Sequence, residues 1–488
     1  MLTRREALRG AVAAATVIGF SPEARAWIGH KPRSPVDQIP PLDGELVTDP
    51  ASLSAAAVDA GYAISRTPLA VLRPGSVQDI QKMVKFCRKH RIEVAARGQG
   101  HTTFGQALVK GGLIIEMSSL SAIHSITADR AVVDAGVKWT DLVTQAVGFG
   151  LTPPVLTGYI GLSVGGTLSV GGISVTYNSG AQIDNVWELE VVNGLGELIT
   201  CSPTRNRDLF EGVLGGLGQY GIITKATVKL VPAPEFVRVY TIDYADSKPF
   251  FKDFRKIIHR QELDDAYNYG LPDGTHTTGG WIYQLNLGAH FNAANPPNDA
   301  HLLRGLTVPP SAAVAQDVPY LAYTMRVNQG IDFLRSIGMW DNVMHPWFDV
   351  FLPDETVEPY VRSVTASLTP EDVGETGFLL LFAQRRSKAK MPMLRKPIGK
   401  SDWFFLFDIL TSASAPGFDA DFDRRMRARN RRLFQKARLL GGMRYPIGTL
   451  DFNKLDWIHH YGERLPKILL LKARHDPSRI LTPGPDIF

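Results

Sequence analysis

The sequence predicts a protein that combines α-helices and β-strands in two domains of unequal size, with three domains as the alternative. Its 488 residues are too many for one compact hydrophobic core. Residues 77–90 repeat apolar side chains at helical spacing directly after Ser76, which is a favoured capping residue. Short apolar runs at residues 92–96 and 113–117 are typical of β-strands, so both kinds of element are expected.

The composition is that of an ordinary soluble globular protein. Hydrophobic residues make up 44% of the chain and charged residues 21%. The formal net charge is +5, of which residues 1–26 contribute +2, and the remaining +3 gives no support for nucleic-acid binding. A run of six arginines in residues 424–432 lacks the interleaved aromatic residues of a nucleic-acid site. We therefore interpret it as the solvated face of a helix.

The sequence contains two cysteines, so at most one disulfide can form within the chain, and it contains no metal-binding motif. Cys87 falls on the apolar face of the predicted helix, which favours a buried thiol, and a disulfide with Cys201 stays open. No CxxC or HExxH spacing occurs in the sequence, so no metal site is predicted.

The N-terminal residues 1–26 have the pattern of an export signal. The pair Arg4 and Arg5 precedes an apolar stretch at residues 11–20, and residues 24–26 form a small-x-small cleavage pattern. The apolar stretch is too short for a stable membrane anchor. The arginine pair resembles a twin-arginine signal, which exports proteins already folded around a cofactor. We expect a periplasmic or secreted protein that begins near Trp27, while an ordinary secretory signal or a disordered tail are the alternatives.

A glycine-rich loop at residues 97–106 is the first candidate for chemistry. Glycines at 98, 100 and 105 permit positive φ angles and let backbone N–H groups converge on an anion such as a pyrophosphate. His101 would present a nucleophilic ring nitrogen in the middle of that loop. Taken alone, the loop is better explained as a glycine-rich turn with a surface histidine.

The segment Gly216–Gly221 has a literal GxGxxG spacing in the wrong context. A dinucleotide-binding fingerprint follows a strand and opens a helix. Here the preceding residues 207–214 predict a helix and the following residues 222–230 predict a strand. Nicotinamide binding through this motif is therefore not expected.

Other segments are assigned more simply. Residues 281–287 and 403–410 predict buried strands, and residues 295–316, rich in Pro, Ala and Asn, predict a long loop.

Five ordered blocks together resemble the cytokinin dehydrogenases, members of the vanillyl-alcohol-oxidase-type flavoprotein superfamily. They are residues 97–101 (RGQGH), 157–174, 182–192, 201–226 and 474–488. The resemblance is dense over residues 65–235, thin over 240–440, and returns at residues 345–347 and from Tyr445 to the end. The resemblance implies an α+β fold with a PCMH-type FAD-binding domain of two subdomains plus an α+β cap (substrate) domain. The expected segments are the signal 1–26, an N-terminal extension 27–64, the FAD-binding domain 65–238, the cap 239–444 and a C-terminal return 445–488.

The resemblance also implies FAD, bonded covalently to the position of His101. Thr102 replaces the family's Ser and retains the hydroxyl, whereas Pro485 stands where a Gln contact is common. Tyr159 and Ile160 have no Cys beside them, so a single flavin link is expected. The other positions carried over as FAD contacts are Ala96, Arg97, Gly98, Gln99, Gly100, Thr102, Gln106, Gly158, Ser163, Ser169, Ile173, Ile223, Tyr445 and Thr482.

The catalytic acids of the resembled family do not carry over. Gly158 stands where an Asp would take the proton of the substrate amine, and Asn268 is the nearest match to a Glu that binds the substrate. The catalytic residues therefore stay open. Tyr159, Asp265 and Tyr267 are candidates, with Asp184, Asp264 and His345 as further ones, and each also fits a structural role.

The sequence thus predicts an FAD-dependent oxidoreductase that transfers a hydride from a small organic substrate. Amines, alcohols and phenols remain open as substrates, and oxygen or a quinone as electron acceptor. One alternative is oxidation of a C–OH bond on the same fold. Another is a flavoprotein that carries electrons or binds a ligand without cytokinin turnover. The intact loops argue against a binding protein that has lost its flavin, and neither nucleic acid nor a stable membrane anchor is expected.

Overall fold

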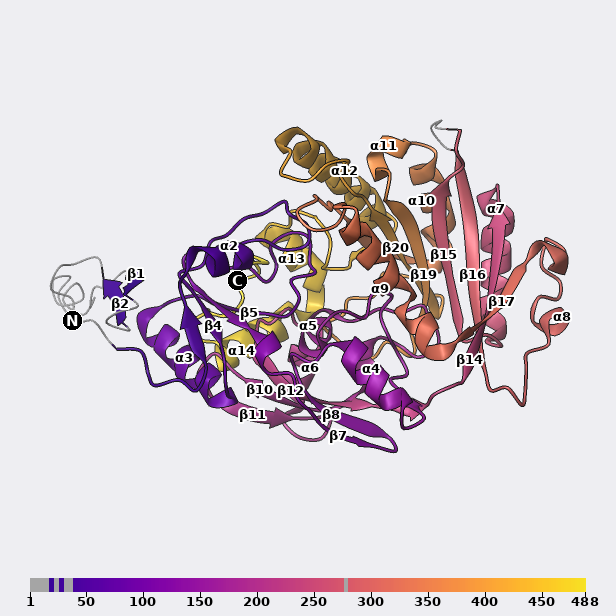
Figure 1. Ribbon diagram of the computed structural model, residues 1–488. Helices are drawn as coiled ribbons and strands as arrows, with labels where there is room; N and C mark the ends of the chain where they lie inside the picture. The colour runs from indigo at the N-terminus through magenta and orange to yellow at the C-terminus, as the bar shows by residue number, and fades with distance from the viewer. Residues whose placement is uncertain (1–16, 22–25, 30–37, 276–279) are drawn as a thin grey trace.

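The computed structural model describes residues 17–21, 26–29, 38–275 and 280–488. Three larger β-sheets and their helices form the molecule, which confirms the α+β fold (Figure 1). The arginine pair and most of the apolar stretch of the expected export signal lie outside the described residues. Within those ranges, β1 (Val17–Ser21) pairs with β2 (Ala26–Gly29), and no helix has the length and apolarity needed to cross a bilayer.

The first sheet has four strands in the order β3-β4-β6-β5. Its central strands are parallel, because helix α3 connects β4 to β5 across one face. The helix begins where the Ser76 hydroxyl accepts the Asp79 N–H and ends at Arg91, which has φ of 54°. The elements are β3 (Glu45–Val47), α2 (Pro50–Ala56), β4 (Ala70–Arg73), α3 (Val77–His90), β5 (Val94–Arg97), β6 (Leu113–Glu116) and the 3-10 turn Met117–Ser119.

The second sheet has five antiparallel strands in the order β11-β10-β12-β8-β7. Helix α6 comes before β12, so the Gly216–Gly221 segment joins a helix to a strand, in the order expected from the sequence. The elements are β7 (Ile123–Thr127), β8 (Arg130–Asp134), α4 (Trp139–Val147), β9 (Leu151–Thr152), α5 (Val164–Val170), the 3-10 turn Gln182–Asn185, β10 (Val186–Val192), β11 (Leu198–Cys201), α6 (Arg207–Val213), β12 (Ile222–Lys229) and β13 (Val231–Pro232), which pairs with β9.

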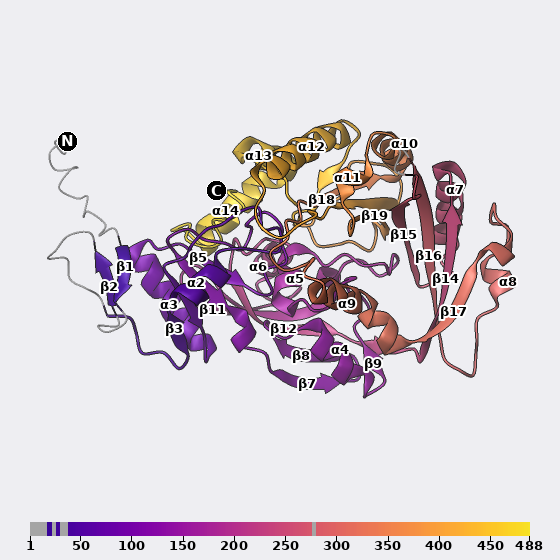
Figure 2. The same cartoon turned by 45° about the horizontal axis from the view of Figure 1, so that its top comes forward.

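The third sheet has eight antiparallel strands in the order β17-β14-β16-β15-β19-β20-β18-β21. Helices α7 and α10 cover one face, and α9 lies on the side of the two smaller sheets (Figures 1 and 2). The elements are β14 (Phe236–Tyr244), α7 (Ser247–Arg260), β15 (Asp265–Pro272), β16 (Trp281–Phe291), α8 (Asp299–Leu302), the 3-10 turn Pro310–Ala312, β17 (Val314–Pro319), α9 (Tyr320–Ser336), β18 (Phe348–Pro353), α10 (Asp354–Thr365), α11 (Pro370–Val373), β19 (Phe378–Arg385), β20 (Trp403–Leu410), α12 (Ala420–Leu439) and β21 (Met443–Arg444).

Two expectations from the sequence are wrong in detail. Residues 295–316 are not a structureless loop, because they contain α8 and the start of β17, which pairs with β14. The arginine-rich helix α12 is only partly solvated: Arg429 is buried and donates to the Thr411 hydroxyl at 2.9 Å. Cys87 and Cys201 are both buried free thiols.

The C-terminal residues return to the first sheet. After α13 (Lys454–Tyr461) and α14 (Leu465–His475), the Thr482 N–H donates to the Val94 carbonyl at 2.7 Å. A buried ion pair fixes this return, with Lys472 Nζ 2.9 Å from the Asp476 carboxylate. The same carboxylate accepts the Leu481 N–H at 2.9 Å, so it binds both the lysine and the backbone of the C-terminal segment.

We predict that Asp476→Ala lowers the free energy of unfolding by about 3 kcal/mol, because it leaves the Lys472 ammonium buried and unpaired. The control is Asp208→Ala, which removes the exposed ion pair with Arg474 on the same helix. That change should lower the free energy of unfolding by less than about 1 kcal/mol. Equal losses in denaturant unfolding would contradict the role of the buried pair.

Candidate active site

A cavity of about 830 Å³ lies between the glycine-rich loop and the eight-stranded sheet. Its walls come from segments far apart in the sequence: residues 96–107, residues 157–173, helix α9, alternate positions of the sheet, and residues 445–482. The volume is within the usual range for cofactor and substrate sites.

The sheet forms one wall of the cavity with every second residue of its strands, because successive side chains of a strand point to opposite faces. On β15 the lining residues are Tyr267, Tyr269 and Leu271, and on β19 they are Phe378, Leu380 and Phe382. The opposite face packs against helices: Phe250 of α7, for example, stacks on Tyr283. One sheet therefore has a core face and a cavity face.

The glycine-rich loop is held in place from two sides. Buried Asp59 accepts the Gly105 N–H at 2.6 Å and the Thr102 hydroxyl at 3.2 Å. Burial raises the pKa of Asp59 to about 6, so its carboxyl is mostly ionised at neutral pH. From the other end of the chain, the Ile447 carbonyl accepts the Thr103 N–H at 2.9 Å. The loop is thus clamped between the N-terminal and C-terminal parts of the fold.

The clamped loop offers free donors to the cavity. Among the described residues, no acceptor receives the backbone N–H groups of Gln99, Gly100, His101 and Thr102. Ser163, at the start of α5, has a buried hydroxyl that likewise lacks a described partner. A Cβ at Gly98 would lie 2.1 Å from that hydroxyl, so the glycine allows the loop and the helix to meet. Such unpaired donors in a tight concavity suit a pyrophosphate.

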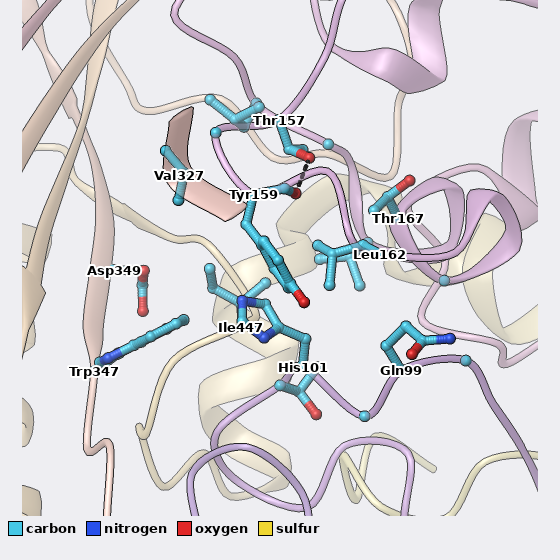
Figure 3. Close-up of a pocket in the computed structure, with 18 of the residues that line it drawn as sticks. Gln99, His101, Thr157, Tyr159, Leu162, Thr167, Val327, Trp347, Asp349 and Ile447 are labelled. Atoms are coloured by element: carbon cyan, nitrogen blue, oxygen red, sulfur yellow. Dashed lines mark hydrogen bonds between the residues drawn. The ribbon is translucent and has the colours of Figure 1, made fainter. Parts of the chain in front are cut away.

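His101 lines the cavity, and Figure 3 shows its ring directed toward the ring of Tyr159. The ring centroids of these two residues are 5.0 Å apart, and Trp340 and Trp347 lie at 6.0 and 5.3 Å from His101. Burial, with smaller contributions from His345 and Arg335, lowers the pKa of His101 to about 3. The imidazole is therefore neutral at working pH and has a nucleophilic nitrogen.

The structure brings nearly all of the predicted cofactor positions together. Arg97 is the exception, because its guanidinium donates to the Val58 carbonyl at 2.7 Å and does not line the cavity. The positions that do line it are Ala96, Gly98, Gln99, Gly100, His101, Thr102, Gln106, Gly158, Ser163, Ser169, Ile173, Ile223, Tyr445 and Thr482.

Comparisons with known proteins match both halves of the chain. Residues 68–202 match the model of an FAD binding domain, and residues 271–488 match a model described as cytokinin dehydrogenase 1, FAD and cytokinin binding. The chain belongs to the cytokinin dehydrogenase family. Cytokinin dehydrogenase 4 of Arabidopsis thaliana is 32% identical over 92% of this chain and 93% of its own length. Cytokinin dehydrogenase 1 of Oryza sativa subsp. japonica is 32% identical over 91% and 92%. An uncharacterized oxidoreductase from the fasciation locus of Rhodococcoides fascians is 36% identical over 91% and 99%.

The protein is accordingly an FAD-dependent oxidoreductase, and the cavity fits that cofactor. The loop donors at residues 99–102 and the Ser163 hydroxyl suit its phosphates. Tyr445 contacts the backbone N–H groups of Gly172 and Ile173, which joins the C-terminal return to the second glycine-rich segment. When bound, FAD supplies the two-electron redox chemistry, while the chain binds it and shields it from water.

The six catalytic candidates fall into two separate cavities. Tyr159, Tyr267 and His345 line the large cavity. The candidate acids Asp184, Asp264 and Asp265 line a second, more polar cavity behind helix α9. Asp265 is held there by the Tyr323 hydroxyl at 2.9 Å and by His290. None of these three acids lines the large cavity.

The placement of Asn268 at a substrate position is also corrected. Asn268 points to the other face of β15, where its amide donates to the Gln284 carbonyl at 3.0 Å. Its neighbours Tyr267 and Tyr269 face the cavity instead. Because side chains alternate along a strand, an alignment error of one residue moves the side chain to the opposite face. Gly158 does line the cavity, and a Cβ there would meet only Val327, at 3.8 Å.

Two acidic residues of the large cavity were missed by the sequence reasoning. Asp349 on β18 and Asp408 on β20 stand directly opposite each other and both line the cavity. Each lies in a run of otherwise apolar residues, at 347–352 and 403–410. The acid inside each apolar run was the signal that could have identified a functional residue, because charged side chains are rare in buried strands.

We predict that Gly98→Ala lowers the FAD content of the purified protein severely, because the new methyl collides with the Ser163 hydroxyl. Adding Ser163→Ala should restore much of the FAD, since that change removes the colliding oxygen and leaves a Cβ at 3.3 Å. Gly330→Ala is the control, because Gly330 lines the same cavity with open space around it. The flavin-to-protein absorbance ratio measures all three, and a full ratio in Gly98→Ala would contradict the fit.

Proposed function

We propose that this chain oxidises a small organic substrate by hydride transfer to FAD that is covalently attached through His101. The observation that supports this best is the place of His101: a neutral imidazole in a clamped loop, facing the junction of the cofactor loops and the cap wall. A neutral ring nitrogen can form the bond, whereas a protonated one cannot.

The substrate side of the cavity favours a small molecule with an apolar body. Aromatic and aliphatic side chains of β15 and β19 form most of that wall, with Val327 and Leu334 of α9 opposite. Relatives of this chain are named cytokinin dehydrogenases, so oxidation of a cytokinin-like amine is the first candidate. Since Gly158 provides no carboxylate, we keep oxidation of an alcohol or phenol C–OH bond as the second candidate. Oxygen or a quinone is the proposed electron acceptor.

We also propose export through the twin-arginine-like signal of residues 1–26, supported by Arg4, Arg5 and the apolar stretch behind them. Fractionation of cells that express the full chain tests this. A folded, flavin-loaded protein outside the cytoplasm is expected, and Arg4→Lys with Arg5→Lys should retain it inside.

Covalent attachment predicts that yellow colour stays with the protein pellet after acid precipitation. His101→Ala should release the flavin into the supernatant. His345→Asn, which removes the other imidazole of the cavity, should leave the pellet yellow. A colourless wild-type pellet with free FAD above it would contradict the His101 link.

Anaerobic mixing tests the redox function. We expect the flavin absorbance of the wild type to bleach with at least one of N6-isopentenyladenine, benzylamine and benzyl alcohol, because the cavity accepts small apolar molecules. Bleaching by the alcohol alone would favour the second candidate. A protein that keeps its flavin oxidised with all three, while dithionite reduces it, would contradict hydride transfer from such substrates.

A further inference from the structure

Asp349 and Asp408 form a pair of buried carboxyls in the wall of the cavity. They are directly opposite each other on antiparallel strands, where Cβ atoms are about 4.5–5.5 Å apart. Each residue is only 3% exposed. Figure 3 shows the Asp349 side chain beside Trp347, whose ring is 5.3 Å from that of His101.

The pair has almost no support from the surrounding protein. Within the part of the chain that the structure describes, no N–H or O–H donates to either oxygen of Asp349 or to Oδ1 of Asp408. The carboxyls interact with each other, so a proton held by one can be shared with its neighbour. Buried carboxyls that serve structure alone are normally surrounded by donors, as Asp59 and Asp476 are in this protein.

Two charged or titratable groups flank the pair. Arg444 on β21 approaches Asp349 from the neighbouring strand, and its charge favours ionisation of that carboxyl. Tyr445 follows it, with its N–H 3.2 Å from the Asp349 carbonyl. Burial dominates all the same: it raises the pKa of Asp349 to about 7 and, together with the charge of Asp349, raises that of Asp408 well above its usual range. Two carboxyls this close do not both ionise at neutral pH.

We propose that the Asp349–Asp408 pair, holding one shared proton, is the proton acceptor for the substrate X–H group, where X is nitrogen or oxygen. The inference rests on the proposed function. In the step, the substrate C–H bond breaks and its electron pair leaves with hydrogen as hydride to FAD. The X–H bond breaks, its proton passes to the singly ionised pair, and the C=X double bond forms from the electrons left behind. The pair ends fully protonated and FAD ends reduced by two electrons.

The Asp349–Asp408 pair would replace the base that Gly158 cannot provide. The carboxylate comes from the sheet wall of the cap and not from the loop at residues 157–159, while both positions line the same cavity. A general base with a pKa near 7 is well matched to neutral conditions, and such groups commonly accelerate reactions about 10²–10⁴-fold.

The first test needs no substrate. The folded protein binds a proton at Asp349 up to about pH 7, whereas the unfolded chain loses that proton near its ordinary pKa of 3.8. Stability therefore falls as pH rises from about 4 to 7 and stays low above. Asp349→Asn should raise the melting temperature at pH 8 by about 2 °C or more and weaken this pH dependence. Asp421→Asn, at a highly exposed acid, is the control. No gain at pH 8 in Asp349→Asn would overturn the shared-proton assignment.

The second test measures the rate of anaerobic flavin reduction against pH with whichever of N6-isopentenyladenine, benzylamine and benzyl alcohol reduces the wild type. The rate should rise with pH through an apparent pKa near 7. Asp349→Asn and Asp408→Asn should each slow reduction about 100-fold or more while keeping FAD content, and should lose that pKa.

The outcomes separate the inference from the proposed function. Unchanged rates in both variants, with an active wild type, would overturn the acceptor role and leave the proposed function standing. A wild type reduced by none of the three probes would contradict the proposed function, and the acceptor role with it.

Discussion

The clamp on the glycine-rich loop is the constraint on which the rest of the site depends. Asp59 holds the loop from the N-terminal side through Gly105, and residues 446–449 hold it from the C-terminal side through Thr103 and Gln106. The loop has glycines where the backbone must approach α5, so it cannot define its own shape. With both ends of the chain in place, His101 faces the cavity.

The eight-stranded sheet separates two environments, because one of its faces packs in the apolar core and the other lines the cavity. One face packs a conventional apolar core against α7 and α10, with Phe254 on Phe405 as an example. The other face borders the cavity, and there the strands carry tyrosines and the Asp349–Asp408 pair. Placing two carboxyls on this face costs stability through desolvation. Retaining such a cost is typical of groups that act on a ligand.

Local patterns made several elements of the fold predictable. The helix at Val77–His90 was predicted to the residue because its cap, apolar spacing and end all agree, and the strand at Trp403–Leu410 likewise. The inverted context of Gly216–Gly221 correctly excluded a dinucleotide fingerprint. The cofactor positions came from the resemblance, since nothing local in Tyr445 or Thr482 indicates that they meet the loop of His101.

What the sequence could not provide was the pairing of distant strands and the phase of their side chains. Asn268 and Tyr269 differ by one position, yet they face opposite sides of β15. Asp349 and Asp408 are 59 positions apart in the numbering and become neighbours only through the register of β18 and β20. Arg429 belongs to an arginine run that looks solvated, but it is buried and donates to the Asp372 and Pro346 carbonyls and to the Thr411 hydroxyl.

The most direct test of the central claim is mass spectrometry of a tryptic digest of the flavin-loaded protein. Cleavage after Arg97 and Lys110 releases one peptide, residues 98–110, that contains all of the loop after Arg97 and a single histidine. We expect this peptide to carry the mass of one FAD, or of the FMN that remains after cleavage of the pyrophosphate. Fragment ions should place the addition on His101. An unmodified 98–110 peptide from protein that contained stoichiometric flavin would contradict the claim.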